Sequence, residues 1–416
     1  MFGINKKIPI ADEKVIRQAF DRHTGDLGRR LQDKSFSNQD TGVFPSVDEA
    51  VKILGSRRCR IYLGIDPTGL DIHFGHTIPL LFLKQILKPE LGGHRPVLVI
   101  GDFTARIGDP TGKESARKPL TEKEVKDNMK NYLEQVYKIL PRGSFDVKYN
   151  SSWLSKMTFE DVVKLASHVT VQQMITRDMF QERIKNERPI GLHEFLYPLM
   201  QGYDSVFMEI DGEVGGNDQT FNMLVGRDLE KKLLNKDKLV FTTQLLVDTT
   251  TGKKMSKSEG GLISVSDTPG DMVGKIMSVP DGFIRGMFKL CTERDMDWID
   301  EHDDDMKTKP YEYKKELAKE LVKMYHGERW ATKAMDEWEK VFSKGEMPSE
   351  METVSGAGQV MTNVIAGIVQ GSNTEAKKLL DQGAVRVNDI VVKDWGNELK
   401  EGDILQVGPK TFRKVK

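Results

Sequence analysis

The chain has 416 residues, of which 30% are charged, and a formal net charge of −1 at pH 7. This length accommodates roughly two to four domains, and the composition is typical of a globular protein. The two cysteines, Cys59 and Cys291, stand far apart in the sequence, which excludes a disulfide framework and a cysteine-rich zinc site. There is no apolar run of about 18 residues and no apolar signal core, so we expect a cytoplasmic protein without a membrane span.

Residues 1 to about 45 predict an N-terminal extension made of a helix and a connector, because they are polar and carry a run of charges. Residues 46–54 predict a short helix before the first strand. Ser46 and Glu49 stand at the spacing of a capping box, in which two side chains satisfy the first backbone N–H groups of a helix.

The stretch YLGIDPTGLDIHFGH, residues 62–76, predicts a strand, a turn and the start of a helix. A helix start offers backbone N–H groups and the positive end of the helix dipole, which suits a phosphate. His73 and His76 can both donate to phosphate oxygens, and Gly75 lets a flat ring approach the backbone. A chance strand, turn and helix with two surface histidines would explain the same pattern.

Residues 96–101 predict a buried parallel strand that leads into a glycine-rich, charged loop over residues 101–117. Lys113 and Arg117 supply positive charge suited to a phosphate. The loop is not a P-loop, because Glu114 follows Lys113 where that motif needs serine or threonine. Taken alone, the loop is better explained as a charged surface segment.

Residues 121–140 predict a helix that Thr121 and Glu124 cap, and residues 145–149 predict a strand. Asn150 follows this strand directly. A residue just past the carboxyl end of a parallel strand is a usual ligand position.

The segment HEFLYPLMQGYD, residues 193–204, predicts a helix with a polar stripe on an otherwise apolar surface. Tyr197, Gln201 and Asp204 fall at positions i, i+4 and i+7 of one face. A polar ligand explains this stripe best. The alternative is a face turned to solvent, in a helix that begins or kinks at Pro198.

Two further segments carry polar side chains suited to a nucleotide. Residues 212–222 are glycine-rich and contain amide and carboxylate groups that bind amines, hydroxyls and ribose, although a turn also explains this composition. After a predicted strand over residues 239–246, residues 248–261 predict a lysine-rich, mobile loop. A solvated lysine run is the usual meaning of such a loop.

The remainder of the chain predicts helices over residues 265–345, including 311–325 and 330–342, and then a linker over residues 343–358. The last 60 or so residues predict a separate unit with a helix over residues 374–380 and a strand-like segment over residues 384–392. This tail is locally basic, which suits a phosphate backbone.

The order of these motifs resembles the bacterial tyrosyl-tRNA synthetases, a class I aminoacyl-tRNA synthetase family of the long-loop KMSKS type. The resemblance rests on HFGH at residues 73–76, on the Y-x-x-x-Q-x-x-D helix, and on KMSKS at residues 254–258, and it covers roughly residues 50–416. Phe74 stands where the HIGH signature has isoleucine. The terminal unit resembles the RNA-binding fold shared with a small-subunit ribosomal protein of the S-four type.

The resemblance implies an architecture of three parts after the N-terminal extension. Residues 46–264 are expected to form a catalytic domain, a Rossmann-like, doubly wound parallel α/β sheet with helices on both faces. Residues 265–345 are expected to form an all-α anticodon-binding domain. Residues 346–416 are expected to contain the linker and a small α+β RNA-binding domain.

The resemblance also assigns roles residue by residue. For substrate tyrosine it implies that Tyr62 and Asp204 bind the hydroxyl, and that Tyr197, Gln201 and Asp109 hold the ammonium group. It also implies that Asp66 and Gln219 line the pocket near the carboxylate, and that Asn150 lines the side of the pocket. For ATP it implies Gly64, Thr68, His73, Gly75, His76, Asp218 and Lys257. For catalysis, chiefly charge neutralisation on the phosphates, it implies His73, His76, Lys113, Arg117, Lys254, Lys257 and Ser258. Many long-loop members have a basic residue where Tyr62 stands.

The implied reaction is attack of the tyrosine carboxylate on the α-phosphorus of ATP, followed by transfer of tyrosine to the tRNA. It needs positioning and charge stabilisation and no protein nucleophile. We expect Mg²⁺ to accompany ATP as part of the substrate, with no metal site on the protein. The implied partners are tRNA, L-tyrosine, ATP and a second copy of the chain, without DNA or a membrane.

Three alternative functions fit the sequence less well. A small-cofactor nucleotidyltransferase with H-x-G-H is usually shorter and would not explain KMSKS with a basic tail. A tryptophanyl enzyme fits Asp204 and Tyr62 less well, because these residues favour a substrate that bears a hydroxyl. A non-catalytic RNA-binding relative is disfavoured because both histidines and the KMSKS lysines are intact.

Overall fold

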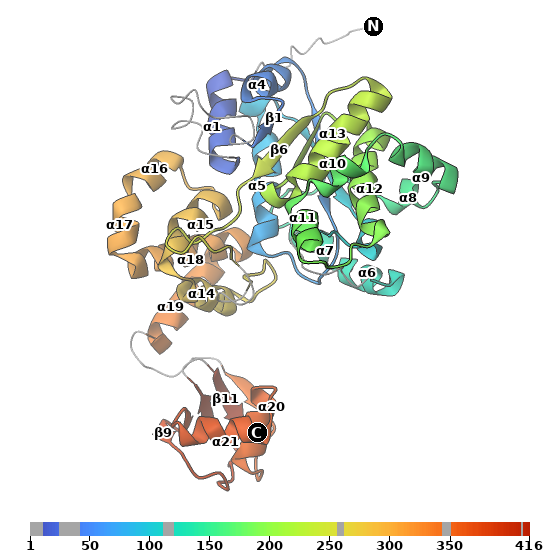
Figure 1. Cartoon of the computed structure of the whole chain (residues 1–416). Coiled ribbons are helices and arrows are strands. Elements are labelled where there is room, and N and C mark those ends of the chain that lie inside the picture. The colour runs from blue at the N-terminus through green and yellow to red at the C-terminus, as the bar shows by residue number, and fades with distance from the viewer. Residues whose placement is uncertain (1–10, 25–41, 111–119, 256–261, 343–350, 409–410) are drawn as a thin grey trace. The chain divides into compact units, whose positions relative to one another are not determined.

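The structure is a computed structural model that describes residues 11–24, 42–110, 120–255, 262–342, 351–408 and 411–416. The chain divides into two compact units, Met1–Thr332 and Lys333–Lys416. In Figure 1 the first unit runs from blue to orange, and the second from orange to red. None of the helices in the described ranges combines the length and the apolarity needed to span a bilayer.

The first unit is built on a six-stranded sheet with the order β1-β6-β5-β2-β3-β4. All neighbouring pairs are parallel except β1 with β6. The strands are β1 (Val43–Phe44), β2 (Arg60–Ile65), β3 (Arg95–Ile100), β4 (Asp146–Tyr149), β5 (Gly212–Gly216) and β6 (Leu239–Thr243). The chain order reverses between β2 and β5, so the doubly wound parallel sheet expected from the sequence is confirmed, and ligands of such sheets bind at this reversal.

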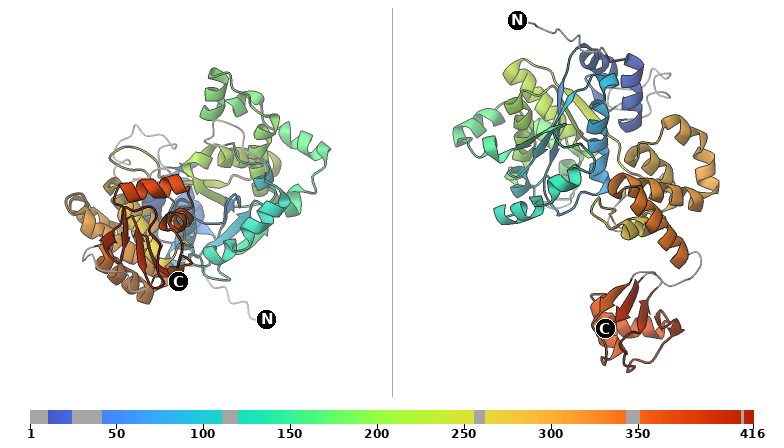
Figure 2. Two further views of the ribbon diagram at one scale, coloured as in Figure 1. Left: turned by 90° about the horizontal axis from the view of Figure 1, so that it is seen from below. Right: turned by 180° about the vertical axis from the view of Figure 1, so that it is seen from behind.

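Helices cover both faces of the sheet. Helix α5 (Phe74–Ile86) packs against β2, β3 and β5, whereas α13 (Thr220–Leu234) packs against β5 and β6 and along α12 (Leu192–Met208). Figures 1 and 2 show α5 on the opposite side of the sheet from α12 and α13. This follows from right-handed crossovers that leave β2 and β5 in opposite directions.

The predicted strands are apolar where the sheet buries them. Every residue of β3 from Pro96 to Ile100 is buried, as the continuous apolar run predicts. In β2 only Gly64 is exposed, and it faces the cavity described below.

Capping accounts for several helix starts. Ser46 accepts a hydrogen bond from the Glu49 N–H at the start of α4 (Val47–Ser56), and Thr121 and Glu124 form the predicted capping box. The helix predicted over residues 121–140 is, however, broken into α6 (Glu122–Met129) and α7 (Tyr132–Val136). Helix α12 continues through Pro198 to Met208, four residues beyond the predicted end at Asp204.

Between β4 and α12 the chain forms four short helices, α8 (Ser151–Leu154), α9 (Phe159–Ala166), α10 (Val171–Ile175) and α11 (Asp178–Lys185). Single 3₁₀ turns are η1 (Pro89–Leu91), η2 (Thr104–Arg106), η3 (Asn217–Gln219) and η4 (Asp281–Phe283). None of these short elements is predicted separately from the sequence, although α9 and α10 begin with capping boxes at Thr158 and Asp161 and at Thr170 and Gln173.

The glycine-rich residues 212–216 form the central strand β5, although their composition also fitted a turn. A Cβ at Gly212 would lie 3.3 to 3.4 Å from Ile61, Phe241 and Leu239. A Cβ at Gly215 would lie 3.1 Å from Met223 Sδ. Glycine is therefore used here for close packing on both sides of a buried strand.

Helix α1 (Glu13–His23) ties the N-terminal segment into the core. Its Phe20 is buried and stacks with Phe82, with ring centroids 6.5 Å apart. Arg22 donates to the carbonyl oxygens of Lys289 and Thr292, at the end of α15 (Ile284–Cys291). The predicted helix in the first 45 residues is confirmed, and it links the sheet region with the helical segment.

The helical segment predicted after residue 265 is confirmed. It consists of α14 (Pro269–Ser278), α15 (Ile284–Cys291), α16 (Met296–Glu301), α17 (Asp303–Thr308), α18 (Pro310–His326) and α19 (Glu328–Phe342). The cysteines Cys59 and Cys291 are both buried free thiols.

The second unit has a five-stranded sheet of order β7-β11-β10-β8-β9 with its own apolar core. Its elements are β7 (Glu352–Val354), α20 (Met361–Ile368), α21 (Asn373–Asp381), β8 (Val385–Val387), β9 (Ile390–Val391), β10 (Ile404–Val407) and β11 (Thr411–Val415). The predicted strand-like segment 384–392 is a hairpin, because Asn388 and Asp389 adopt positive φ and turn the chain. Part of the predicted linker 343–358 is strand β7, because it pairs with β11.

Candidate active site

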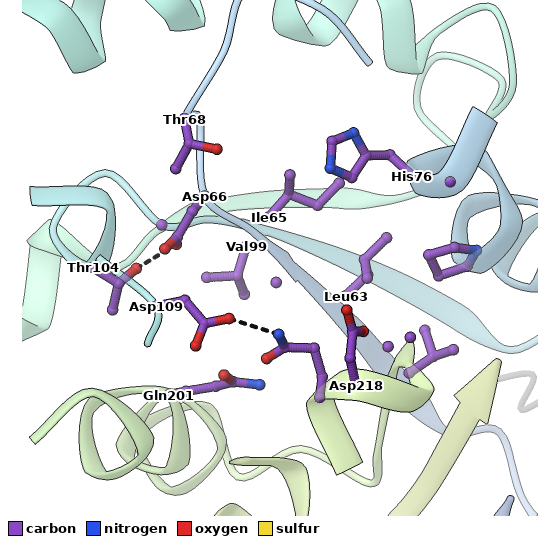
Figure 3. Close-up of a pocket in the computed structure, with 18 of the residues that line it drawn as sticks. Leu63, Ile65, Asp66, Thr68, His76, Val99, Thr104, Asp109, Gln201 and Asp218 are labelled. Carbon is purple, nitrogen blue, oxygen red and sulfur yellow. Dashed lines mark hydrogen bonds between the residues drawn. The ribbon is translucent and has the colours of Figure 1, made fainter. Parts of the chain in front are cut away.

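A cavity of about 470 Å³ opens at the carboxyl ends of β2, β3 and β5 (Figure 3). Its walls bring together most of the residues that the sequence singled out. These are Gly64, Asp66, Thr68, His73, Gly75, His76, Asp109, Asn150, Tyr197, Gln201, Asp204, Asp218, Gln219 and Lys254. Four other predicted residues lie outside the described residues, namely Lys113, Arg117, Lys257 and Ser258.

One end of the cavity is built on the start of α5. His73 is the N-cap residue of this helix, and its ring stacks on that of His76 with centroids 3.8 Å apart. Burial, together with the nearby His73 and Lys254, lowers the pKa of His76 to about 3. His76 is therefore a neutral imidazole at pH 7, while the helix start supplies backbone N–H groups and a positive dipole end.

The chain that follows the KMSKS residues returns to the HFGH residues. Phe74 donates its N–H to the Ile263 carbonyl oxygen at 3.0 Å, and Ser264 Oγ donates to the Ile72 carbonyl oxygen at 3.2 Å. On the other flank, Lys254 Nζ lies 3.2 Å from Asp218 Oδ2. Lys254 and the two histidines therefore line the same end of one cavity.

The other end of the cavity holds a buried carboxyl group. Asp204 is 3% exposed, and it accepts hydrogen bonds from Trp153 Nε1 at 2.7 Å and from Asn150 Nδ2 at 3.2 Å. Burial raises the pKa of Asp204 well above its ordinary value, despite these two donors. Such a group gains most from a ligand that brings a further hydrogen-bond partner.

Acidic and amide oxygens surround the middle of the cavity. Asp66 accepts hydrogen bonds from Thr104 Oγ1 at 2.7 Å and from Tyr197 Oη at 2.8 Å. Gln219 Nε2 donates to Asp109 Oδ2 at 2.7 Å. Figure 3 shows Asp66, Thr104, Asp109 and Gln201 on one side of the cavity, and His76 and Asp218 on the other.

The protonation of Tyr197 and the lack of a side chain at Gly101 determine how Asp66 is held. Burial raises the pKa of the Tyr197 hydroxyl well above its ordinary value, so this group stays protonated and donates. A Cβ at position 101 would lie 1.9 Å from Asp66 Oδ1, so only glycine allows the Asp66 side chain to lie across the end of β3. The middle of the cavity is thus rich in acceptors, which suits a cationic group.

Tyr62 differs from the other predicted tyrosine-binding residues in its position. It is completely buried and is not among the residues that line the cavity. Its hydroxyl contacts Ser205 Oγ at 3.1 Å and donates to the Gln201 carbonyl oxygen at 3.3 Å. The contact of Tyr62 with the substrate hydroxyl stays a prediction. The buried position of Tyr62 does not support it.

The sequence did not single out four residues that shape the cavity or its floor, namely Thr104, Trp153, Glu213 and Lys238. Thr104 and Trp153 lie in the first turns after β3 and β4, so their place beyond the ends of parallel strands was an available signal. Glu213 and Lys238 carry no local signal, because one is in a buried strand and the other directly precedes one. Within the described residues, no three histidine, cysteine, aspartate or glutamate side chains are grouped so as to hold a metal ion.

The fold and the cavity define a class I aminoacyl-tRNA synthetase. A family model described as tRNA synthetases class I (W and Y) matches residues 55–343. The structure is also similar to a C-terminally truncated mitochondrial tyrosyl-tRNA synthetase of Aspergillus nidulans, with a TM-score of 0.59, 21% identity, and coverage of 80% of this chain and 100% of that one. At that identity the likeness concerns the fold alone.

Relatives in sequence are closer. The tyrosine–tRNA ligase of Carboxydothermus hydrogenoformans is 43% identical over 86% of this chain and 89% of its own length. The tyrosine–tRNA ligase of Haemophilus influenzae is 39% identical over 90% of this chain and 94% of its own length. The chain therefore belongs to the tyrosyl-tRNA synthetase family.

Proposed function

We propose that the chain activates L-tyrosine with ATP to form tyrosyl-adenylate and pyrophosphate, and then transfers tyrosine to the 3′ end of its tRNA. The observation that carries this proposal is the make-up of one cavity. A histidine pair, a helix start and Lys254 line one end, and a buried aspartate lies at the other, with acceptors for an ammonium group between them. This order matches the parts of the two substrates.

The chemistry fits the groups at hand. The tyrosine carboxylate attacks the α-phosphorus of ATP, the bond to the β-phosphate oxygen breaks, and pyrophosphate leaves. Negative charge increases on the phosphate oxygens, and the N–H groups of the α5 start, the imidazoles and Lys254 lie where they can stabilise it. We assign the roles of Lys113, Arg117, Lys257 and Ser258 by family resemblance alone.

The position of Asp204 supports a substrate that bears a hydroxyl group. A buried carboxyl group that already holds two donors retains acceptor capacity for a substrate hydroxyl. Sites built to bind a substrate hydroxyl reject the analogue that lacks it by about 10⁵-fold. This value is itself a known example from the same enzyme family. The phenyl ring of phenylalanine would leave Asp204 without that partner.

Mg²⁺ is proposed to enter with ATP, held by phosphate oxygens and water. Residues 265–345 are proposed to bind the anticodon region, and residues 346–416 to contain the RNA-binding unit of S-four type. Support for the latter comes from exposed basic side chains, which suit a phosphate backbone. They include Lys377, Lys378, Arg386 and Lys414.

A homodimer is also part of the proposal. Apolar side chains are exposed on the short helices after β4, where Phe159 is 84% exposed and Val163 is 53% exposed on one face of α9. Phe207 of α12 is 53% exposed as well. Such side chains are typical of surfaces that a partner covers. We propose a cytoplasmic location because tRNA is charged where proteins are made.

Charging of unfractionated bacterial tRNA tests the proposed function. With ATP and Mg²⁺, the full chain is expected to attach labelled tyrosine to tRNA, and to attach neither tryptophan nor phenylalanine at comparable rates. Charging with tryptophan in preference to tyrosine would overturn the proposal.

A further inference from the structure

A group of buried polar side chains lies beneath the cavity and is not needed for the steps above. Lys238, Glu213, Ser205 and Tyr62 are each at most 1% exposed. Lys238 Nζ contacts Glu213 Oε2 and donates to Ser205 Oγ, while the Tyr62 hydroxyl contacts Ser205 Oγ. Four different elements or their flanks contribute to this group. We call these four residues, together with Gln201, the Lys238 network.

Stability alone is a poor explanation for the Lys238 network. Burying a lysine and a glutamate removes both from water, and replacing such a pair by apolar side chains is often neutral or stabilising. The pair nevertheless lies directly under a ligand cavity. A geometric role, in which the pair orients a residue of the cavity, explains this position better.

The network reaches the cavity through the side-chain amide of Gln201. Glu213 is itself in the cavity wall, and its Oε1 accepts a hydrogen bond from Gln201 Nε2 at 2.9 Å. An amide has a donor end and an acceptor end. Because the donor end is held by Glu213, the acceptor end, Gln201 Oε1, is left to meet a ligand in the cavity.

The backbone of the same residue is held as well. The Tyr62 hydroxyl donates to the Gln201 carbonyl oxygen at 3.3 Å, and the Lys238 ammonium group lies 5.6 Å from the centroid of the Tyr62 ring. Side chain and backbone of Gln201 are thus fixed by one connected set of contacts. An ammonium group in the cavity requires this orientation, since the amide NH₂ end would repel it.

We propose that Lys238 is a positioning residue that keeps Glu213 an acceptor, so that Gln201 presents its oxygen to the α-ammonium group of the amino acid substrate. This inference rests on the proposed function, which places that ammonium group beside Gln201. Without Lys238, the buried Glu213 lacks its cation. If Glu213 then binds a proton, its carboxyl O–H would donate to Gln201 Oε1. The amide would then turn its NH₂ end to the cavity.

The test is Lys238→Met in ATP–pyrophosphate exchange, with 3-(4-hydroxyphenyl)propionate as a competitive inhibitor that lacks the ammonium group. The KM for tyrosine is expected to rise about 10- to 100-fold, the cost of losing a charge-assisted hydrogen bond. The KM for ATP and the inhibition constant of the analogue are expected to stay unchanged. An equal loss of affinity for tyrosine and for the analogue would overturn the proposal.

Two further variants separate positioning from stability. Arg183→Met removes the cation of another buried pair, in which Arg183 and Glu194 are each 2% exposed, and it is expected to lower stability without changing the ratio of tyrosine to analogue affinity. Glu213→Leu combined with Lys238→Met removes both charges and the acceptor for Gln201, and is expected to regain thermal stability while the KM for tyrosine stays raised. Recovery of that KM together with stability would show a purely structural pair.

The proposed function and the inference fail in different ways. If the unmodified chain shows no tyrosine-dependent exchange, the proposed function is wrong. If it shows exchange and Lys238→Met leaves the ratio of tyrosine to analogue affinity unchanged, only the role of Lys238 is wrong.

Discussion

Asp204 is the residue on which amino acid selectivity depends in this account. Asp204→Asn keeps the shape and removes the capacity to accept as a carboxylate. Since leaving a buried polar group without its partner costs about 1–3 kcal/mol, discrimination between tyrosine and phenylalanine is expected to fall about 5- to 100-fold. Exchange rates with both amino acids measure this ratio, and an unchanged ratio would show that Asp204 serves only to bind Trp153 and Asn150.

Tyr62 provides the contrasting case at the same scale. Its hydroxyl contacts Ser205 and the Gln201 carbonyl oxygen within the protein. Tyr62→Phe is therefore expected to cost about 1 kcal/mol in the free energy of unfolding. Selectivity for tyrosine over phenylalanine is expected to be kept. A large loss of selectivity in exchange assays, with stability intact, would instead support the direct contact that family resemblance implies.

The site residues that the sequence identified are those with a local signature. His73, His76, Tyr197, Gln201 and Asp204 follow helix spacing or the end of a strand, and such positions can be read from a linear pattern. Lys238 and Glu213 could not be found this way, because their pairing depends on two neighbouring strands of the sheet. Similarly, the burial of Tyr62 beneath the cavity depends on how α12 crosses β2.

At the scale of elements, helix α1 carries a histidine that links stability to pH. Burial lowers the pKa of His23 to about 3. The unfolded chain binds this proton near pH 6.5 and the folded chain does not, so the stabilisation is complete above pH 6.5 and is lost as the pH falls toward 3. His76 and His94 are shifted in the same direction.

Substituting His23 is expected to reduce this pH dependence. In His23→Gln the decrease in unfolding free energy between pH 6 and pH 4 should be smaller than in the unmodified chain by about 1.4 kcal/mol per pH unit. Urea unfolding at several pH values measures the difference. Parallel curves for the two proteins would contradict the buried, neutral state of His23.

Elements with a strong periodic or capping signal were predicted well, and those set by tertiary packing were not. β3 and α4 match their predicted bounds to within two residues. β5 looked like a turn because its glycines are there for close contacts with Ile61 and Met223, which no local pattern reveals. Strand β7 fell within a predicted linker for a similar reason, since only its pairing with β11 orders it as a strand.

At the scale of the whole molecule, the second unit has a core of its own, formed by residues between Met361 and Val415. A chain that ends after Phe342 keeps helix α19 and is expected to retain tyrosine-dependent exchange. Its KM for tRNA is expected to rise about tenfold or more, because phosphate contacts supply much of the affinity for nucleic acids. Equal loss of exchange and charging, in a truncated chain that still unfolds cooperatively, would argue against a separate RNA-binding unit.

The central claim is that one cavity joins ATP and tyrosine without a protein nucleophile. ATP–pyrophosphate exchange by the purified full chain, in the presence of Mg²⁺ and one amino acid at a time, tests it most directly. The account predicts rapid exchange with tyrosine, and only slow exchange with phenylalanine and tryptophan. Exchange that is absent with tyrosine, or faster with tryptophan, would contradict it.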